Sequence, residues 1–178
     1  PVLTPLAVDG SRPFPLLANK TLNIAVCLQS KEKNISSKGK STDAESEKHF
    51  AIVQVPSIMP RFLELPCDEG RAFTLLEEII TSKLPELFEL HSIHASCPFR
   101  VTRDSDLEID EEAEDFMSEV KKSIKRRKRG RPVRLEVLQK CDKDLRGFLV
   151  NQLKIKKNEI YQLPGPLDLT FFSKFAGI

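Results

Sequence analysis

Three histidines, His49, His91 and His94, are the only imidazole side chains in the 178-residue chain. A histidine that acts as a nucleophile in group transfer needs an orienting carboxylate and several cationic or amide donors around the transferred group. His91 and His94 lie three positions apart with no glycine-rich loop beside them, and His49 enters an apolar stretch at Phe50. This setting favours ordinary surface or half-buried histidines over a catalytic one.

The cysteines and the acidic run 104–112 are the candidates for metal binding. The four cysteines are widely spaced and form no C-x-x-C pair, so we expect reduced, mostly buried thiols in a cytoplasmic protein. A calcium-binding EF-hand loop needs Gly at its sixth position and Glu at its twelfth. Counted from Asp104, those positions hold Ile109 and Asp115. The acidic run therefore favours a negatively charged helix start, and no metal site is expected.

The basic run 121–131 (KKSIKRRKRGR) suggests a different class of protein. Its end, Arg129–Pro132, matches the core of an AT-hook, a peptide that binds the minor groove of DNA. An AT-hook must be extended and exposed, whereas this run begins in a helical pattern and leads directly into the apolar sequence VRLEV. A small nucleic-acid-binding protein that uses 121–132 is the alternative interpretation; solvated cations at a helix end, or cations that face an anionic polymer, explain the same residues.

Three arginines are candidate contacts for an anionic ligand or for a neighbouring domain: Arg61, Arg100 and Arg103. On an extended strand, Arg100 and Arg103 face opposite sides. Such an arginine either pairs with a local carboxylate, such as Asp104 or Asp106, or presents its planar group to a ligand or partner. We expect structural pairing more than ligand binding.

Composition limits the function further. Lys and Arg number 28 against 26 Asp and Glu, which gives a formal net charge of +2. This balance does not favour a dedicated nucleic-acid or membrane binder. No apolar run approaches the roughly 20 residues that span a bilayer. Because the chain begins with Pro1, we expect it to be a piece of a longer protein.

The N-terminal third predicts an extended arm and a hairpin. Residues 1–18 contain four prolines among apolar residues, which favours an extended segment packed on a surface. Alternating apolar residues predict strands over 21–28 and 49–55. The polar, Ser/Lys/Glu-rich residues 30–47 between them predict a mobile loop.

The remaining chain predicts alternating helices and strands. Residues 56–66 contain three prolines and favour an extended connector. Helical spacing over 73–88 predicts a helix with Thr74 as its cap, which Pro85 interrupts or restarts. Further along, we expect strands over 95–102, 132–138 and 159–163, and helices over 110–129 (ended by Gly130), 142–153 and 167–175. The fold class is therefore α+β, a mixed sheet with helices packed on it.

Five stretches resemble one known family in the right order and spacing. They are PFPLLANKTLNIAVCL (13–28), HFAIVQVPSIMPRFLELP (49–66), PFRVTRDSDLEIDEE (98–112), GRPVRLEV (130–137) and YQLPGPLDLT (161–170). Together they are similar to the head, or middle, domain of the polyphosphate kinases, with 19–178 as that domain. Asn19-Lys20-Thr21 departs from the family pattern, which has Asn-Leu-Ser or nearly so, and Ser105 stands where Ala is commoner.

The resemblance implies a cytoplasmic transferase of polyphosphate biosynthesis that moves the terminal phosphate of ATP reversibly onto inorganic polyphosphate. The parent is implied to be a phosphoprotein that acts through a phosphohistidine and binds ATP and Mg²⁺, and to associate peripherally with a membrane in some cases. The nucleophile would lie in flanking C-terminal domains, so this piece would be inactive and without cofactors. The head domain would support dimerisation, contact the flanking domains and form part of the wall of the polyphosphate tunnel; DNA would not be a partner.

Overall fold

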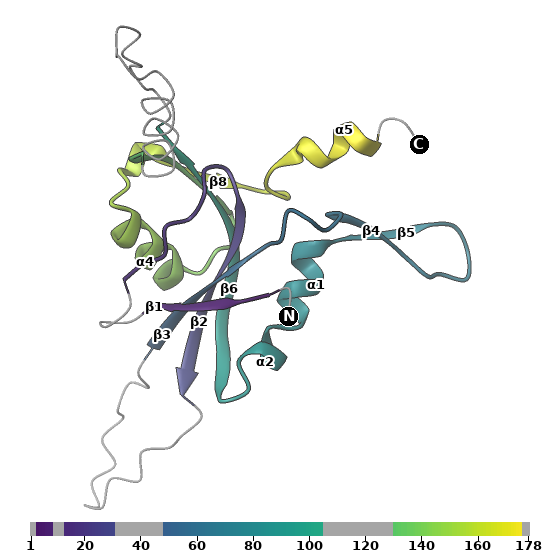
Figure 1. Ribbon diagram of the computed structural model, residues 1–178, viewed down its shortest axis with the longest axis horizontal. Coiled ribbons are helices and arrows are strands. Elements are labelled where there is room, and N and C mark those ends of the chain that lie inside the picture. Colours follow the sequence, from purple (N-terminus) through teal and green to yellow (C-terminus); the bar gives the residue numbers. More distant parts are fainter. Residues whose placement is uncertain (1–2, 9–12, 31–47, 105–129, 176–178) are drawn as a thin grey trace, which may run out of the picture.

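A six-stranded mixed sheet forms the centre of the molecule, with helices on both of its faces (Figure 1). The computed structural model describes residues 3–8, 13–30, 48–104 and 130–175. The strand order is β1 (Pro5–Val8), β3 (Lys48–Gln54), β2 (Leu22–Ser30), β6 (His91–Arg103), β7 (Pro132–Leu138) and β8 (Ile160–Leu163). Neighbouring strands are antiparallel except β7 and β8, which are parallel. The predicted α+β class is confirmed.

Strands β2 and β3 form the expected antiparallel hairpin, in register from Asn23–Gln54 to Gln29–Lys48. Residues 22–28 of β2 are all buried. A strand in the middle of a sheet with helices on both faces must be apolar on both sides, and β2 meets this requirement except at Asn23. Except for Ser30, the predicted loop 30–47 lies outside the described residues.

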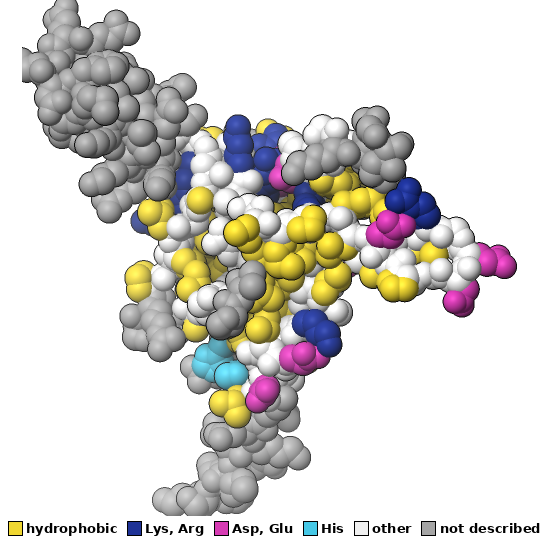
Figure 2. Space-filling view, turned by 45° about the vertical axis from the view of Figure 1, so that its right-hand side comes forward, with side chains coloured by type: hydrophobic (Ala, Val, Ile, Leu, Met, Phe, Trp, Pro, Cys, Tyr) yellow, Lys and Arg dark blue, Asp and Glu magenta, His cyan; other side chains and the backbone are white. Residues whose placement is uncertain are grey.

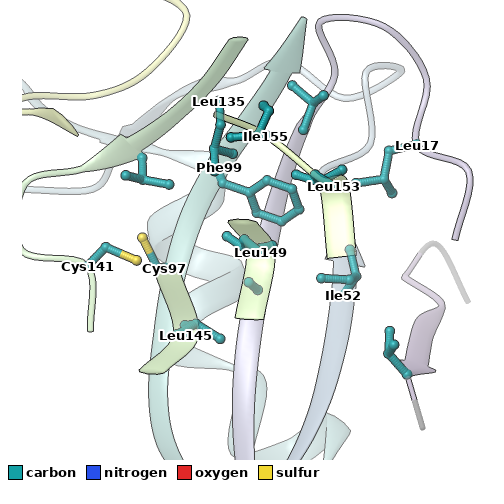
Figure 3. Packing of buried hydrophobic residues seen from close by; sticks show 14 of the residues in the cluster. Leu17, Ile52, Cys97, Phe99, Leu135, Cys141, Leu145, Leu149, Leu153 and Ile155 are labelled. Carbon is teal, nitrogen blue, oxygen red and sulfur yellow. The ribbon is translucent and has the colours of Figure 1, made fainter. Parts of the chain in front are cut away.

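Each face of the sheet has its own hydrophobic core. Helix α4 (Lys143–Leu153) covers one face, where Leu145 and Leu149 pack near Phe99 of β6 (Figure 3). Helices α1 (Leu76–Ser82) and α2 (Leu84–Leu87) cover the other face. The Asp142 carboxylate caps α4 by accepting hydrogen bonds from two backbone N–H groups of its first turn, at 3.0 and 3.1 Å. The predicted helix 142–153 is confirmed.

A second, two-stranded sheet corrects the prediction for 56–75. Strand β4 (Phe62–Leu65) pairs with β5 (Ala72–Leu75), and this hairpin extends away from the main sheet (Figure 1). The three prolines of 56–66 lie outside β4, so they leave its backbone N–H groups free for pairing. Thr74 belongs to β5 and is not a helix cap; α1 begins at Leu76, and Pro85 lies in the first turn of α2.

The two ends of the described chain pack against this framework. Part of the predicted N-terminal arm forms β1, an edge strand on β3, where proline is tolerated. The C-terminal segment forms the 3-10 helix η2 (Leu169–Phe171) and then α5 (Phe172–Phe175), so the helix predicted over 167–175 begins only at Leu169 and its first turn is 3-10. The predicted helix 110–129 lies outside the described residues. Among the described helices, none is long and apolar enough to cross a bilayer.

Candidate functional site

Arg61 joins helix α1 to the C-terminal segment. Its Nε lies 3.0 and 3.1 Å from the two carboxylate oxygens of Glu77, whose side chain is only 3% exposed. The same guanidinium donates hydrogen bonds to the carbonyl oxygens of Leu167 and Asp168, and it lies 4.8 Å from the centre of the Phe171 ring. Arg61 is therefore engaged on all sides by partners from this chain.

Arg100 holds the same segment from the main sheet. Its two terminal nitrogens lie 3.4 Å from carboxylate oxygens of Glu136 and Asp168, and its Nε donates a hydrogen bond of 3.0 Å to the Lys20 carbonyl oxygen. Arg61 also approaches the Asp168 carboxylate, at 4.0 Å. Asp168 is thus the point at which two of the three predicted arginines meet.

A pocket of about 430 Å³ lies beside Arg61 and the start of β2. Arg61, Asp168 and Lys20 are its charged lining residues, and most of its surface is apolar. Hydrophobic side chains gather across the part of the surface seen in Figure 2, with a cluster of Lys and Arg side chains at its upper edge and others farther around it. Lys20 and Asp168 both adopt left-handed backbone conformations, with φ of 62° and 52°. Such conformations are uncommon outside glycine and cluster at functional positions.

Arg103 lies on the other side of β6, as the alternation predicts, and takes no part in this pocket. Its side chain donates to the carbonyl oxygens of Leu17, at 3.0 Å, and Gly130, at 2.9 Å. Its backbone N–H donates to the side-chain oxygen of Asn19 at 2.8 Å. Burial lowers the pKa of Arg103. The residue ties the N-terminal segment and the chain before β7 to the sheet.

Gly130 permits this arrangement because its backbone lies close to that of Asp104, the residue that follows β6. A Cβ atom at this position would lie 1.9 Å from the carbonyl oxygen of Asp104. The Asp104 N–H also donates to the Arg131 carbonyl oxygen, at 2.8 Å. Glycine is required here by the close approach of two backbones. Its predicted role as a helix stop stays a prediction, because residues 110–129 lie outside the described residues.

The histidines lie at the far end of the sheet from the pocket. His49 and His91 belong to β3 and β6, beside the C-terminal end of β2, and their rings are 5.9 Å apart. His94 is an exposed residue of the same strand as His91. Among the described residues, no group of three or more His, Cys, Asp or Glu side chains is arranged to hold a metal ion.

The basic segment that supports the nucleic-acid alternative is described only at its end. Arg131 forms an ion pair with Glu159 at 2.8 Å, and Pro132 begins β7. The last residue of the AT-hook-like sequence is therefore part of the sheet, and residues 121–129 lie outside the described chain. No finding favours the nucleic-acid interpretation.

The sequence indicated the three arginines but not the carboxylates that pair with two of them. Glu77, Glu136 and Asp168 lie far along the chain from the arginines that they contact, and local spacing carries no signal for such pairs. Two of them had a visible clue: Glu136 is a charged residue inside the apolar strand β7, and Asp168 lies in the family-like stretch 161–170.

Comparison with known protein families identifies the chain. Residues 1–175 match the family described as the polyphosphate kinase middle domain. The polyphosphate kinase of Halalkalibacterium halodurans is 45% identical over 177 residues, which are 98% of this chain and 24% of that protein. The polyphosphate kinase of Streptomyces coelicolor is 41% identical over 171 residues, 96% of this chain and 21% of that protein.

The crystal structure of polyphosphate kinase from Porphyromonas gingivalis has the same fold, with a TM-score of 0.69 at 20% identity over 97% of this chain and 22% of that one. The fold of that structure and the match of the sequence to the family model agree. The chain belongs to the polyphosphate kinase family and corresponds to its middle domain. It spans about a quarter of the length of the curated relatives that it matches.

Proposed function

We propose that this chain is the non-catalytic head domain of a polyphosphate kinase. In the whole protein, the terminal phosphate of ATP passes reversibly to inorganic polyphosphate through a phosphohistidine that lies outside these residues, and flanking domains bind ATP and Mg²⁺. The observation that carries the proposal is the match of residues 1–175 to the middle domain of this family. The parent is a cytoplasmic transferase in this proposal.

The pocket beside Arg61 and Arg100 is the proposed contribution to the wall of the polyphosphate tunnel or to a domain contact. Both guanidinium groups are already engaged by carboxylates and carbonyl groups of this chain. We therefore assign them to holding the wall in shape. Arg103, on the opposite side of β6, is assigned to fixing the N-terminal segment.

Two measurements on the isolated chain test whether it lacks catalytic activity and whether it self-associates. Incubated with radioactive ATP and Mg²⁺, the chain is expected to make no polyphosphate and to carry no label on histidine. Sedimentation velocity at rising protein concentration is expected to show self-association. Synthesis of polyphosphate by this chain would contradict the proposed role.

A domain exchange gives a positive readout. In the Halalkalibacterium halodurans enzyme, which is 45% identical in this region, the middle domain is replaced by residues 1–178. We expect the chimera to keep its oligomeric state and to retain polyphosphate synthesis within about tenfold, which corresponds to roughly 1.4 kcal/mol of transition-state stabilisation. A chimera that is folded and correctly assembled, yet fully inactive, would show that this domain does more than support the site.

A further inference from the structure

Two cysteines far apart in the sequence meet beside the core under α4. Strands β6 and β7 pair Phe99 with Val137, so continuing that register places Cys97 opposite position 139. The turn that follows β7 is closed by the Cys141 N–H, which donates to the Leu138 carbonyl oxygen at 2.9 Å. This turn folds Cys141 back toward Cys97, and Figure 3 shows the two sulfur atoms pointing toward each other.

The pair is buried and its thiols are chemically unequal. Cys97 is 1% exposed and Cys141 is 7% exposed, and both are free thiols. The neighbouring Cys141 thiol lowers the pKa of Cys97, whose own thiol contacts the Pro98 carbonyl oxygen at 3.3 Å. The proximity of Cys97, together with burial, raises the pKa of Cys141. Cys97 is thus the sulfur more easily converted to a thiolate, the reactive form, and Cys141 stands next to it.

The other two cysteines provide internal contrasts. Cys27 is fully buried in β2, and burial is the main cause that raises the pKa of its thiol. Cys67 is exposed on the connection between β4 and β5, where its thiol contacts the carbonyl oxygens of Glu69 and Gly70. If exposure alone decides which thiol is oxidised, Cys67 reacts first. If a thiolate beside a second thiol decides it, Cys97 reacts first.

We propose that Cys97 and Cys141 are an oxidation site at which hydrogen peroxide closes an internal disulfide between β6 and the turn that leads into α4. The Cys97 thiolate attacks one peroxide oxygen, so that an S–O bond forms, the O–O bond breaks, and the hydroxide released takes up a proton and leaves as water. Cys141 then attacks the Cys97 sulfenic sulfur: the S–S bond forms, the S–O bond breaks, and the Cys141 proton leaves with the oxygen as a second water. Two thiols lose two electrons and one peroxide is reduced to two waters.

This inference is independent of the proposed function, because it concerns thiols on the α4 side of the sheet and not the arginine pocket. The cross-link closes the chain between 97 and 141 into a loop and so restricts the unfolded state. In a chain of this size we expect the oxidised form to melt about 5–10 °C above the reduced form.

The test uses the reduced 178-residue chain and hydrogen peroxide near equimolar amounts. Thiols counted after denaturation are expected to fall from four to two. Digestion without reductant, followed by mass spectrometry, is expected to show a peptide that joins Cys97 to Cys141, and reductant is expected to restore four thiols and the original Tm. Retention of Cys97 and Cys141 as free thiols while Cys67 oxidises would overturn the proposal.

Single substitutions distinguish the sulfur that attacks the peroxide from the sulfur that then closes the disulfide. Cys67→Ser is the matched control and should form the disulfide as the unaltered chain does. Cys141→Ser, which keeps a polar donor beside the Cys97 sulfur, should leave a sulfenic acid on Cys97 that dimedone traps, whereas Cys97→Ser should leave Cys141 unmodified. Circular dichroism checks that each variant is folded; if a variant is not, the cross-linked peptide of the unaltered chain decides the question alone. An equal dimedone yield in both variants would contradict Cys97 as the attacking thiolate.

Discussion

Arg61 and Arg103 are both withdrawn from solvent, yet the regions that hold them solve the problem of a buried cation differently. Around Arg61, the main partner is the carboxylate of Glu77, and the two side chains are 14% and 3% exposed. Around Arg103, the described acceptors of the side chain are carbonyl oxygens of Leu17 and Gly130. The first region balances charge with charge; the second solvates a charge with peptide dipoles.

The two arrangements should fail in different ways. A buried ion pair costs desolvation on both sides, so removal of one partner leaves the other charge stranded, while replacement of both can be nearly neutral. A cation held by carbonyl groups leaves only uncharged acceptors behind when it is removed, and each loses the free energy of a hydrogen bond. A second-site change can therefore rescue the Arg61 region but not the Arg103 region.

The largest effect is expected for Arg61→Met. It leaves the buried Glu77 carboxylate without its partner, and we expect the free energy of unfolding to fall by about 3–5 kcal/mol. Urea unfolding measures the loss. The double variant Arg61→Met/Glu77→Met removes both charges and should recover at least half of it. A double variant no more stable than the single one would show that the ion pair is not what couples these residues.

Arg103→Met should have a smaller effect, about 2–3 kcal/mol, because two carbonyl oxygens lose a charged hydrogen-bond donor. Since those acceptors carry no net charge, the loss should be the same at low and high salt. Asn19→Ala is the graded control: it removes only the acceptor of the Arg103 backbone N–H and should cost about 1 kcal/mol. A loss at Arg103 that shrinks strongly in salt would place an acidic partner in this region and remove the contrast with Arg61.

Gly130→Ala tests how rigid the Arg103 region is. The added Cβ would lie 1.9 Å from the Asp104 carbonyl oxygen, so the backbone that presents the Gly130 carbonyl group to Arg103 must move. We expect a loss of about 1–3 kcal/mol, the usual cost of overpacking. Gly147→Ala is the control with the opposite sign: nothing lies within 4 Å of its Cβ position, and alanine favours helix α4 by about 1 kcal/mol. Thermal unfolding of both variants settles the comparison.

The contrast also explains what the sequence could predict. Periodicity identified the strands β2, β3 and β7 and helix α4, because one buried face, or two, fixes the pattern of apolar residues locally. It failed at β4, where the prolines on either side suggested an irregular connector, and at Thr74, which proved to be a strand residue. A four-residue strand in a separate small sheet has too few positions for a period to be seen.

The pocket was only half predictable for a related reason. Arginines inside apolar stretches stand out in a sequence, and Arg61 and Arg100 do meet at Asp168. Their partners could not be named, because the pairing of Arg100 with Glu136 depends on the register between β6 and β7. The local partners expected for Arg100, Asp104 and Asp106, come after its strand in the sequence, whereas its ion pairs are formed with Glu136 of β7 and with Asp168 of the C-terminal segment.

The smallest effect is expected where a pair of charges stays in water. Lys48 and Asp144 form an ion pair between β3 and α4, with side chains 39% and 57% exposed. The hydrogen bond and the charge of Lys48 lower the pKa of Asp144, and the same contacts raise the pKa of Lys48. Because the carboxyl pKa is lowered in the folded state, the pair stabilises that state above the unfolded pKa of about 3.9. This stabilisation is lost as pH falls through the folded pKa. Because the lysine pKa is raised in the folded state, the pair stabilises that state below the unfolded lysine pKa of about 10.4. This stabilisation is lost as pH rises through the folded pKa.

The contribution of this pair is therefore confined to the window between about pH 4 and about pH 10. In that window Lys48→Met should lower Tm only slightly, since exposed pairs are screened by water and salt, and the difference should vanish near pH 2, at about two units below the carboxyl value. Melting curves of the two chains across pH, at low and high salt, provide the measurement. A difference in Tm that persisted in acid, or that was as large as the loss caused by Arg61→Met, would contradict this account. It would show that burial is not what makes the Arg61 ion pair stronger than the Lys48 ion pair.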